Sequence, residues 1–448
     1  MFLYSYYMIY NMNANIDIQQ LTYDLDLLFS NADLNIKNML IKKNILTRTK
    51  ILSFSDSLIY KFLCAYKNCT NQQIASKLSY TNYNPINESS YYRKERKIPL
   101  QYYQNMLNKT KILFDKYNNK NNKYIIVAVD GTYNNTNLKK DKTLETSLNM
   151  GYYDVSNGIP IDINLKGNII NKEISSLISY INNSNNIDTN KVIFVLDRAY
   201  FSYDLFKFLE GKHIKFVIRV KNNCVCIKNK KPKNINNVRF VSYVNVLETK
   251  KDKNNNDKSL MRKLSCYLAT NLDLTYNDDV IRNIYKSRWD IEVFFKLVKS
   301  NFRFSYLTEH NGQTNECYGK TYCVILIYFL LERLFEIFMI TPKQNNKYTT
   351  KYNKSLALTG IKQIIPHIIK TNLTTNMLLN YMNAYFKKVR CEKNKSNPRI
   401  SKRPFTKWYV KHYSNFYKYA KIIDCIENDK ISSLNKNLKL EALNIKIL

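Results

Sequence analysis

The spacing of apolar residues over positions 1–120 predicts helices. Residues 55–67 follow an amphipathic helical pattern, and Thr70 opens a second helix with a capping box. A basic, aromatic stretch at residues 91–97 precedes a further helix that begins at Pro99. Two short helices followed by a basic segment are compatible with a helix-turn-helix DNA-binding unit. They are also compatible with a plain helical bundle that has a charged face, and this simpler interpretation is favoured because short motif matches often arise by chance.

The pattern changes to short apolar runs over residues 123–221. Five stretches are predicted as strands: 123–130, 144–155, 159–165, 191–196 and 214–220. Two stretches between them have helical spacing: 173–181 and 202–209. Asn157-Gly158 separates the second strand from the third and is a strong hairpin signal. A meander that continues into strand–helix–strand crossovers requires a mixed sheet with flanking helices, so the sequence predicts an α/β fold.

A polar stretch rich in Lys and Asn follows at residues 222–270. It contains two strand-like pieces, at residues 238–247 and 264–269, and the charged residues 250–258 between them are predicted to form an exposed loop. The stretch is interpreted as a small β-rich insertion before the next helix, whose predicted N-cap is Asp278.

Neither a membrane span nor a signal peptide is predicted. The longest apolar run, residues 324–340, is interrupted by Glu332, Arg333 and Glu336, which is typical of a core helix. The amino terminus is aromatic but lacks the basic segment and the small-residue cleavage site of a signal peptide.

A chain of 448 residues is too long for one ordinary core. Residues 341–448 are basic and helical in patches, with aromatic residues interleaved among the Lys and Arg of residues 387–411. Three regions are predicted: a helical, candidate DNA-binding region at 1–120, an α/β region at 121–340 with its insertion at about 222–272, and a basic helical region at 341–448.

Charge and cysteine content narrow the function classes. Lys and Arg exceed Asp and Glu by 70 − 35 = 35, a charge that attracts polyanions, nucleic acid first and an anionic membrane surface second. The excess of Lys has a second explanation, because A/T-rich codons also produce abundant Lys, Asn, Ile and Tyr. Nine cysteines without a Cys-x-x-Cys pair and four scattered histidines do not support a zinc site or a disulfide framework, and they fit a reducing, intracellular compartment.

The most informative stretch contains Tyr285, Arg288, Glu292 and Lys299. On a helix with 100° per residue, these four side chains fall within about 60° of one another. A carboxylate, two cations and a phenol on one narrow stripe are costly to bury without a function. The stripe is suited to gripping phosphates and holding a metal ion.

Two further carboxylates close predicted strands. Asp130 ends one apolar run before Gly131, and Asp197 ends another. Sites in open α/β sheets are built at the carboxyl ends of strands. With Glu292 they make three carboxylates from three elements, which is the oxygen-only ligation that Mg²⁺ or Mn²⁺ prefers. Two such ions close together can activate water or a 3′-hydroxyl and stabilise the leaving oxygen of a phosphodiester.

Each residue also has a purely structural interpretation. An Asp at a strand end is often a turn former, and Glu292 can pair with Lys296 on a helix surface. Arg288 and Lys299 can be solvated, and Tyr285 can be part of a core. Only the combination of the three carboxylates with the stripe favours a site.

The residues at this point resemble a known family. Residues 285–299, YKSRWDIEVFFKLVK, resemble the Tyr-Arg-Glu-Lys signature of insertion-sequence DDE transposases, specifically the bacterial family numbered four. VAVDGT at 127–132 and FVLDRAYFSYDLF at 194–206 resemble the regions around that family's first two catalytic aspartates. The resemblance extends over about residues 123–307, and Ala199 stands where many relatives have Gly.

The resemblance implies a ribonuclease H-like catalytic domain with a β-rich insertion before the helix that carries the Glu. Asp130, Asp197 and Glu292 are then the catalytic residues and hold two Mg²⁺ ions, for which Mn²⁺ substitutes. The activity implied is cut-and-paste DNA transposition, in which the ends of the element are cleaved and joined to target DNA.

The resemblance also implies DNA contacts. Arg288 and Lys299 would grip phosphates, Tyr285 would contact the backbone of the transposon end, and Arg198 is a further DNA-binding candidate. Trp289 could stack on an unpaired base or pack in the core, and the core is favoured because it points away from the stripe. The expected partners are double-stranded DNA, as terminal inverted repeats and target, and a second copy of the chain on that DNA, with no membrane. The alternatives are a domesticated nuclease that hydrolyses without joining and a DNA-binding derivative without catalytic activity.

Overall fold

The computed structural model describes residues 18–28, 52–67, 70–81, 86–118, 124–138, 144–166, 173–183, 188–220, 237–249, 260–304, 314–339, 348–392 and 399–401. The chain divides into two compact units, one of Met1–Tyr243 with Tyr267–Asn394 and one of Val244–Cys266 with Lys395–Leu448. All the predicted site residues belong to the first unit.

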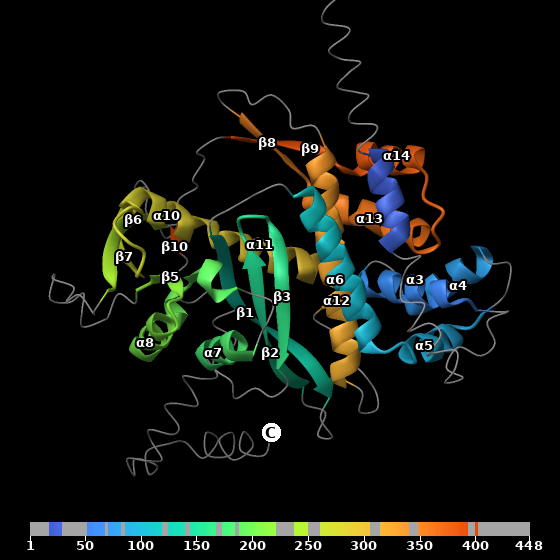
Figure 1. The fold of residues 1–448 in the computed structure, drawn as a ribbon, viewed down its shortest axis with the longest axis horizontal. Coiled ribbons are helices and arrows are strands. Elements are labelled where there is room, and N and C mark those ends of the chain that lie inside the picture. The colour runs from blue at the N-terminus through green and yellow to red at the C-terminus, as the bar shows by residue number, and fades with distance from the viewer. Residues whose placement is uncertain are drawn as a thin grey trace, which may run out of the picture. The chain divides into compact units, whose positions relative to one another are not determined.

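A mixed sheet with the strand order β10-β6-β7-β5-β4-β1-β2-β3 organises the α/β part (Figure 1). The strands are β1 (Ile125–Leu138), β2 (Leu144–Asp154), β3 (Ile159–Lys166), β4 (Val192–Leu196), β5 (Lys215–Arg219), β6 (Arg239–Thr249), β7 (Leu260–Thr270) and β10 (Arg399–Ser401). β1, β4 and β5 run parallel, whereas β2, β3 and β7 are antiparallel to the neighbours with which they are paired. This confirms the predicted mixed sheet with flanking helices.

The β2–β3 hairpin forms where Asn157-Gly158 predicts it. Gly158 has a φ of 74°, a conformation that glycine adopts without strain. The Asp154 carboxylate accepts hydrogen bonds from the backbone N–H of Asn157 at 3.0 Å and from its side-chain amide at 2.6 Å. The turn is therefore fixed by its own residues.

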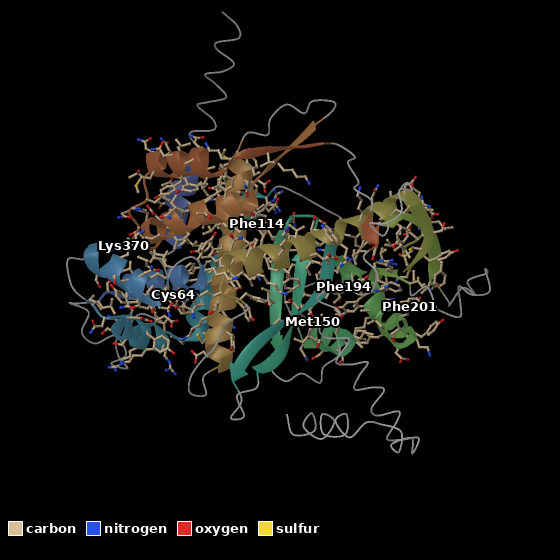
Figure 2. All side chains as sticks on the ribbon, turned by 180° about the vertical axis from the view of Figure 1, so that it is seen from behind. Cys64, Phe114, Met150, Phe194, Phe201 and Lys370 are labelled. Atoms are coloured by element: carbon tan, nitrogen blue, oxygen red, sulfur yellow. The ribbon has the colours of Figure 1, made fainter. Side chains whose placement is uncertain are left out.

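Alternation along β4 assigns the two faces of the sheet. Val192, Phe194 and Leu196 pack in one core cluster, which also contains residues of α7 (Glu173–Asn183) and α8 (Tyr203–Gly211). Ile193 and Val195 pack in another cluster, with residues of α10 (Asp278–Ser287). Figure 2 labels Met150, Phe194 and Phe201, three members of the first cluster. Because side chains alternate along a strand, the odd and even positions of β4 serve different helices.

Helices from both ends of the chain share one core in the first unit. They are α3 (Phe54–Ala65), α4 (Asn71–Thr81), α5 (Glu88–Arg96), α6 (Leu100–Tyr117), α12 (Thr314–Phe338), α13 (Lys354–Ile369) and α14 (Thr375–Tyr385). β8 (Tyr348–Tyr352) and β9 (Lys388–Glu392) form a separate two-stranded sheet. The predicted capping box is confirmed, since Thr70 and Gln73 exchange hydrogen bonds of 2.8 and 3.1 Å.

The apolar run at 324–340 lies almost entirely in α12, which is buried over most of its length. This confirms the prediction of a core helix. None of the helices in the described ranges is long and apolar enough to cross a membrane. The predicted loop at 250–258 and most of the basic region after residue 392 lie outside the described residues.

Candidate active site

The register of β1 and β4 brings Asp130 and Asp197 together. The two parallel strands pair with a constant offset that ends at Ala128 opposite Val195. Continuing this register by two residues places Asp130, within β1, level with Asp197, the first residue after β4. Because side chains alternate, Asp130 shares the face of Ala128 and Asp197 shares the face of Val195. This is the face on which α10 and α11 (Trp289–Asn301) pack.

The sequence predicts one continuous helix through residues 285–299, and this prediction is wrong at Arg288. α10 ends at Ser287, α11 begins at Trp289, and Arg288 lies between them. The Arg288 N–H donates to the Tyr285 carbonyl at 3.1 Å, three residues back rather than four, which is the tighter 3₁₀ pattern. The N-cap of α10 is Asn277 rather than the predicted Asp278, because the Asn277 side chain accepts the hydrogen bond from the Val280 N–H.

Arg288 links the residues of the stripe. Arg288 is 7% exposed, and its guanidinium forms an ion pair with the Glu292 carboxylate, through a short hydrogen bond to Oε1. It also lies 5.9 Å from the centroid of the Tyr285 ring. The proposed metal ligand Glu292 is thus neutralised by Arg288, and not by Lys296 as in the surface-helix interpretation.

A cavity of about 570 Å³ is lined by residues of β1 and α11. Its lining residues come from β1 and from one face of α11: Asp130, Gly131, Thr132, Glu292, Phe295, Lys296, Lys299 and Ser300. The α11 positions recur at helical spacing, so they form one stripe beside the carboxylates. Lys299 therefore lines the same cavity as Asp130 and Glu292.

The electrostatics show that the carboxylates interact. Burial raises the pKa of Asp130 to about 6, against the lowering effect of Arg288 and of a 2.9 Å hydrogen bond from the Gly131 N–H. Glu292 and Asp197 raise it further, because like charges disfavour ionisation. Burial lowers the pKa of Lys299, while the Asp130 charge raises it. The Asp130 carboxyl group thus interacts with the charges of Arg288, Glu292 and Asp197.

Four predicted site residues do not line the cavity: Asp197, Arg288, Tyr285 and Arg198. Tyr285 packs against Tyr243 with ring centroids 5.9 Å apart, and Asp197 is among the charges that raise the pKa of Tyr285. Arg198 is exposed in the short 3₁₀ helix after Asp197. Trp289 is 49% exposed, so its prediction as a core residue is wrong.

The exposure of Trp289 follows from the face that α11 buries. Ile291, Phe294, Phe295 and Val298 are the buried apolar side chains of this helix. Trp289 lies two residues, about 200°, from Ile291 at the start of the helix, and so it faces away from the core.

Glu173 is a further carboxylate of this region, and its sequence context did not distinguish it. It is the first residue of α7, and burial raises its pKa, with further contributions from Asp130 and Asp197. An acidic residue at a helix start is ordinarily explained by the helix dipole, so the sequence contained no distinguishing signal.

The three carboxylates are the kind of ligand that a divalent cation binds, but they are not arranged so that they could bind one. Asp130, Asp197 and Glu292 offer only carboxylate oxygens, which Mg²⁺ and Mn²⁺ prefer. Within the described ranges, no three Asp, Glu, His or Cys side chains are grouped so that they could hold a metal ion as they stand. The ion pair of Glu292 with Arg288 is one physical reason, because Glu292 is directed to the guanidinium.

Residues 152–328 match the family model of the transposase DDE domain. The match supports a DDE transposase, and the mixed sheet with its flanking helices agrees with the ribonuclease H-like fold of such enzymes. Asp197 and Glu292 lie inside the matched segment, whereas Asp130 precedes it. A search of curated proteins finds no match to this chain.

Gly151 sets how closely α11 approaches the sheet. It is the partner of Asp130 in the β1–β2 register, and a Cβ at this position would lie 2.5 Å from Cζ of Phe295. Gly151→Ala is therefore expected to displace Phe295 and to lower the free energy of unfolding by about 1–3 kcal/mol, the usual cost of overpacking. Urea unfolding measures this change.

Gly211→Ala is the matched control, because a Cβ at Gly211 meets nothing within 4 Å. Equal unfolding midpoints for the two alanine variants would show that Gly151 does not determine the packing of α11.

Proposed function

We propose that the chain is a DNA transposase that cleaves transposon ends and joins them to target DNA. The observation that carries this proposal is the interaction of the Asp130 carboxyl group with the charges of Asp197 and Glu292, two residues of a segment that matches the transposase DDE domain. The expected substrates are double-stranded DNA with terminal inverted repeats and a target duplex, bound by two copies of the chain inside the cell.

Asp130, Asp197 and Glu292 would hold two divalent cations, Mg²⁺ or Mn²⁺. Such ions would supply activation of the attacking oxygen and stabilisation of the leaving oxygen. The chain's own cations orient the substrate: Lys299 lies in the cavity to bind a phosphate, and Arg288 offers a fork for two phosphate oxygens. Hydrolysis forms a bond from water oxygen to phosphorus and releases a 3′-hydroxyl, which then displaces a 3′-oxygen in the target strand.

The Arg288–Glu292 ion pair connects DNA binding with formation of the site. A scissile phosphate competes with Glu292 for the guanidinium, because both are anions of suitable geometry. When Arg288 turns to the phosphate, the Glu292 carboxylate is released for metal binding. DNA thus completes the arrangement that the described residues lack on their own.

The test is a strand-transfer assay on duplexes that carry candidate terminal repeats from the DNA flanking the coding region. A transposase gives Mg²⁺-dependent cleavage followed by joined product, and removal of the metal with EDTA abolishes both. Cleavage without joined product would identify a nuclease, and DNA binding without cleavage would identify a catalytically silent derivative.

Lys299→Ala is expected to weaken binding to transposon-end DNA. Loss of one phosphate contact reduces the slope of log K against log salt by about 1. Fluorescence anisotropy at several salt concentrations measures both quantities. Lys207→Ala removes an exposed lysine from α8 and serves as the control. Identical slopes for the two variants would remove Lys299 from the DNA interface.

A further inference from the structure

Gly131 leaves space that the Glu173 carboxylate occupies. A Cβ added to Gly131 would lie 2.6 Å from Oε1 of Glu173 and 2.9 Å from Cδ1 of Leu148, closer than Cβ contacts occur. No positive φ is recorded for Gly131, so its backbone does not require glycine. The contact that a side chain would disrupt is therefore the approach of Glu173 to β1, directly after Asp130.

A buried hydroxyl lies in the same region. Tyr200 follows Asp197 in the 3₁₀ helix and is 0% exposed, and its hydroxyl has no hydrogen-bond partner among the described residues. Burial raises the pKa of Tyr200 well above its ordinary value, and Glu173, Asp130 and Asp197 raise it further. A buried phenol without a partner is costly, which indicates that the groups around it receive a further ligand or water.

We propose that Glu173 is a fourth acidic residue of the metal site, positioned behind Asp130 and Asp197 through the space left by Gly131, with the unpartnered Tyr200 hydroxyl buried in the same region. This inference rests on the proposed function. It adds to the three carboxylates one that approaches β1 from the face covered by α7, opposite to the face of α11.

The physical role follows from charge. Burial raises the pKa of Glu173, and the charges of Asp130 and Asp197 raise it further, because like charges disfavour ionisation of a neighbouring carboxyl group. A divalent cation relieves this repulsion. Glu173 therefore strengthens cation binding and orients the ligands, and it need not touch the reacting phosphate. We class it as a positioning residue.

The experiment is a titration of the metal-free full chain with Mn²⁺, in which free Mn²⁺ is measured by electron paramagnetic resonance. Glu173→Gln is expected to weaken Mn²⁺ binding about tenfold or more, the usual effect of losing an outer carboxylate. Glu173→Asp, which keeps the charge, is expected to restore part of the affinity. Asp204→Asn removes an exposed carboxylate from α8 and is the matched control.

Gly131→Ala supplies an independent test. It displaces the Glu173 carboxylate, so it should weaken Mn²⁺ binding on its own and should add little in a Glu173→Gln background. Residues that act through one contact show this non-additivity. Full additivity of the two changes would overturn the inference.

The stability of metal-free Glu173→Gln separates a metal role from a structural role. Because the pKa of Glu173 is raised, a neutral amide should keep or increase the melting temperature at pH 8. A variant that melts well below the wild type, or that binds Mn²⁺ like Asp204→Asn, would overturn the proposal. Failure of the wild type to cleave DNA or to bind Mn²⁺ would instead refute the proposed function.

Discussion

Glu292→Gln is expected to reduce metal-dependent DNA cleavage about a thousandfold, which corresponds to roughly 4 kcal/mol in activation free energy. The amide oxygen of Gln can still accept the hydrogen bond that Glu292 accepts from Arg288, so folding should be preserved. The negative charge that a metal ion requires is lost. DNA binding should be nearly unchanged, because the change removes no cation. Cleavage kinetics and DNA-binding anisotropy measure the two effects.

Glu336→Gln is a matched control for this change. Glu336 also accepts a hydrogen bond from an arginine, Arg333, on a helix, but it does not line the cavity. The Glu336→Gln variant should cleave DNA like the wild type. Cleavage at the wild-type rate by Glu292→Gln would remove Glu292 from the active site.

Asp130→Asn is expected to abolish cleavage and, at the same time, to stabilise the metal-free protein. The pKa of Asp130 is raised in the folded state to about 6 from an ordinary 3.8, so the folded chain holds this proton more tightly than the unfolded chain. The stability from this proton is complete below about pH 4 and is lost as the pH rises through about 6. Asn does not ionise, and its advantage should reach at most about 3 kcal/mol above pH 6.

Unfolding by urea at pH 4 and pH 8, with EDTA or with saturating Mn²⁺, measures the effect. With EDTA, the Asn variant should exceed the wild type at pH 8 and approach it at pH 4. With Mn²⁺ the order should reverse, because only the wild type is stabilised by a ligand that binds the folded state. A metal-free Asn variant that is less stable than the wild type at pH 8 would show that ionised Asp130 is not strained.

The strands and most helices could be predicted because their signals are local. The hairpin at Asn157-Gly158 depends on a glycine with positive φ and on hydrogen bonds from neighbouring residues. The capping box at Thr70 involves residues three apart. Asp130 and Asp197 could be proposed from sequence because each ends an apolar run, and their convergence follows once β1 and β4 are parallel and in register.

Other features could not be read from local patterns. Trp289 was misplaced because an ideal helix through residues 285–299 does not show which face α11 buries or that Arg288 interrupts the helical hydrogen bonding. Glu173 could not be identified from the sequence, because its proximity to Asp130 arises from the packing of α7 on the sheet and from the space that Gly131 leaves.

The sequence by itself determined the order of the elements, the positions of the two aspartates that follow apolar runs and the residues of the stripe, because periodicity, caps and turn residues act over a few neighbours. Only the tertiary structure decided that Arg288 neutralises Glu292, that Lys299 shares a cavity with Asp130, and that Glu173 approaches from the other face. The relations of Lys299 and Glu173 to Asp130 join residues on different elements, and they are set by the packing of helices on the sheet and by the space that Gly131 leaves.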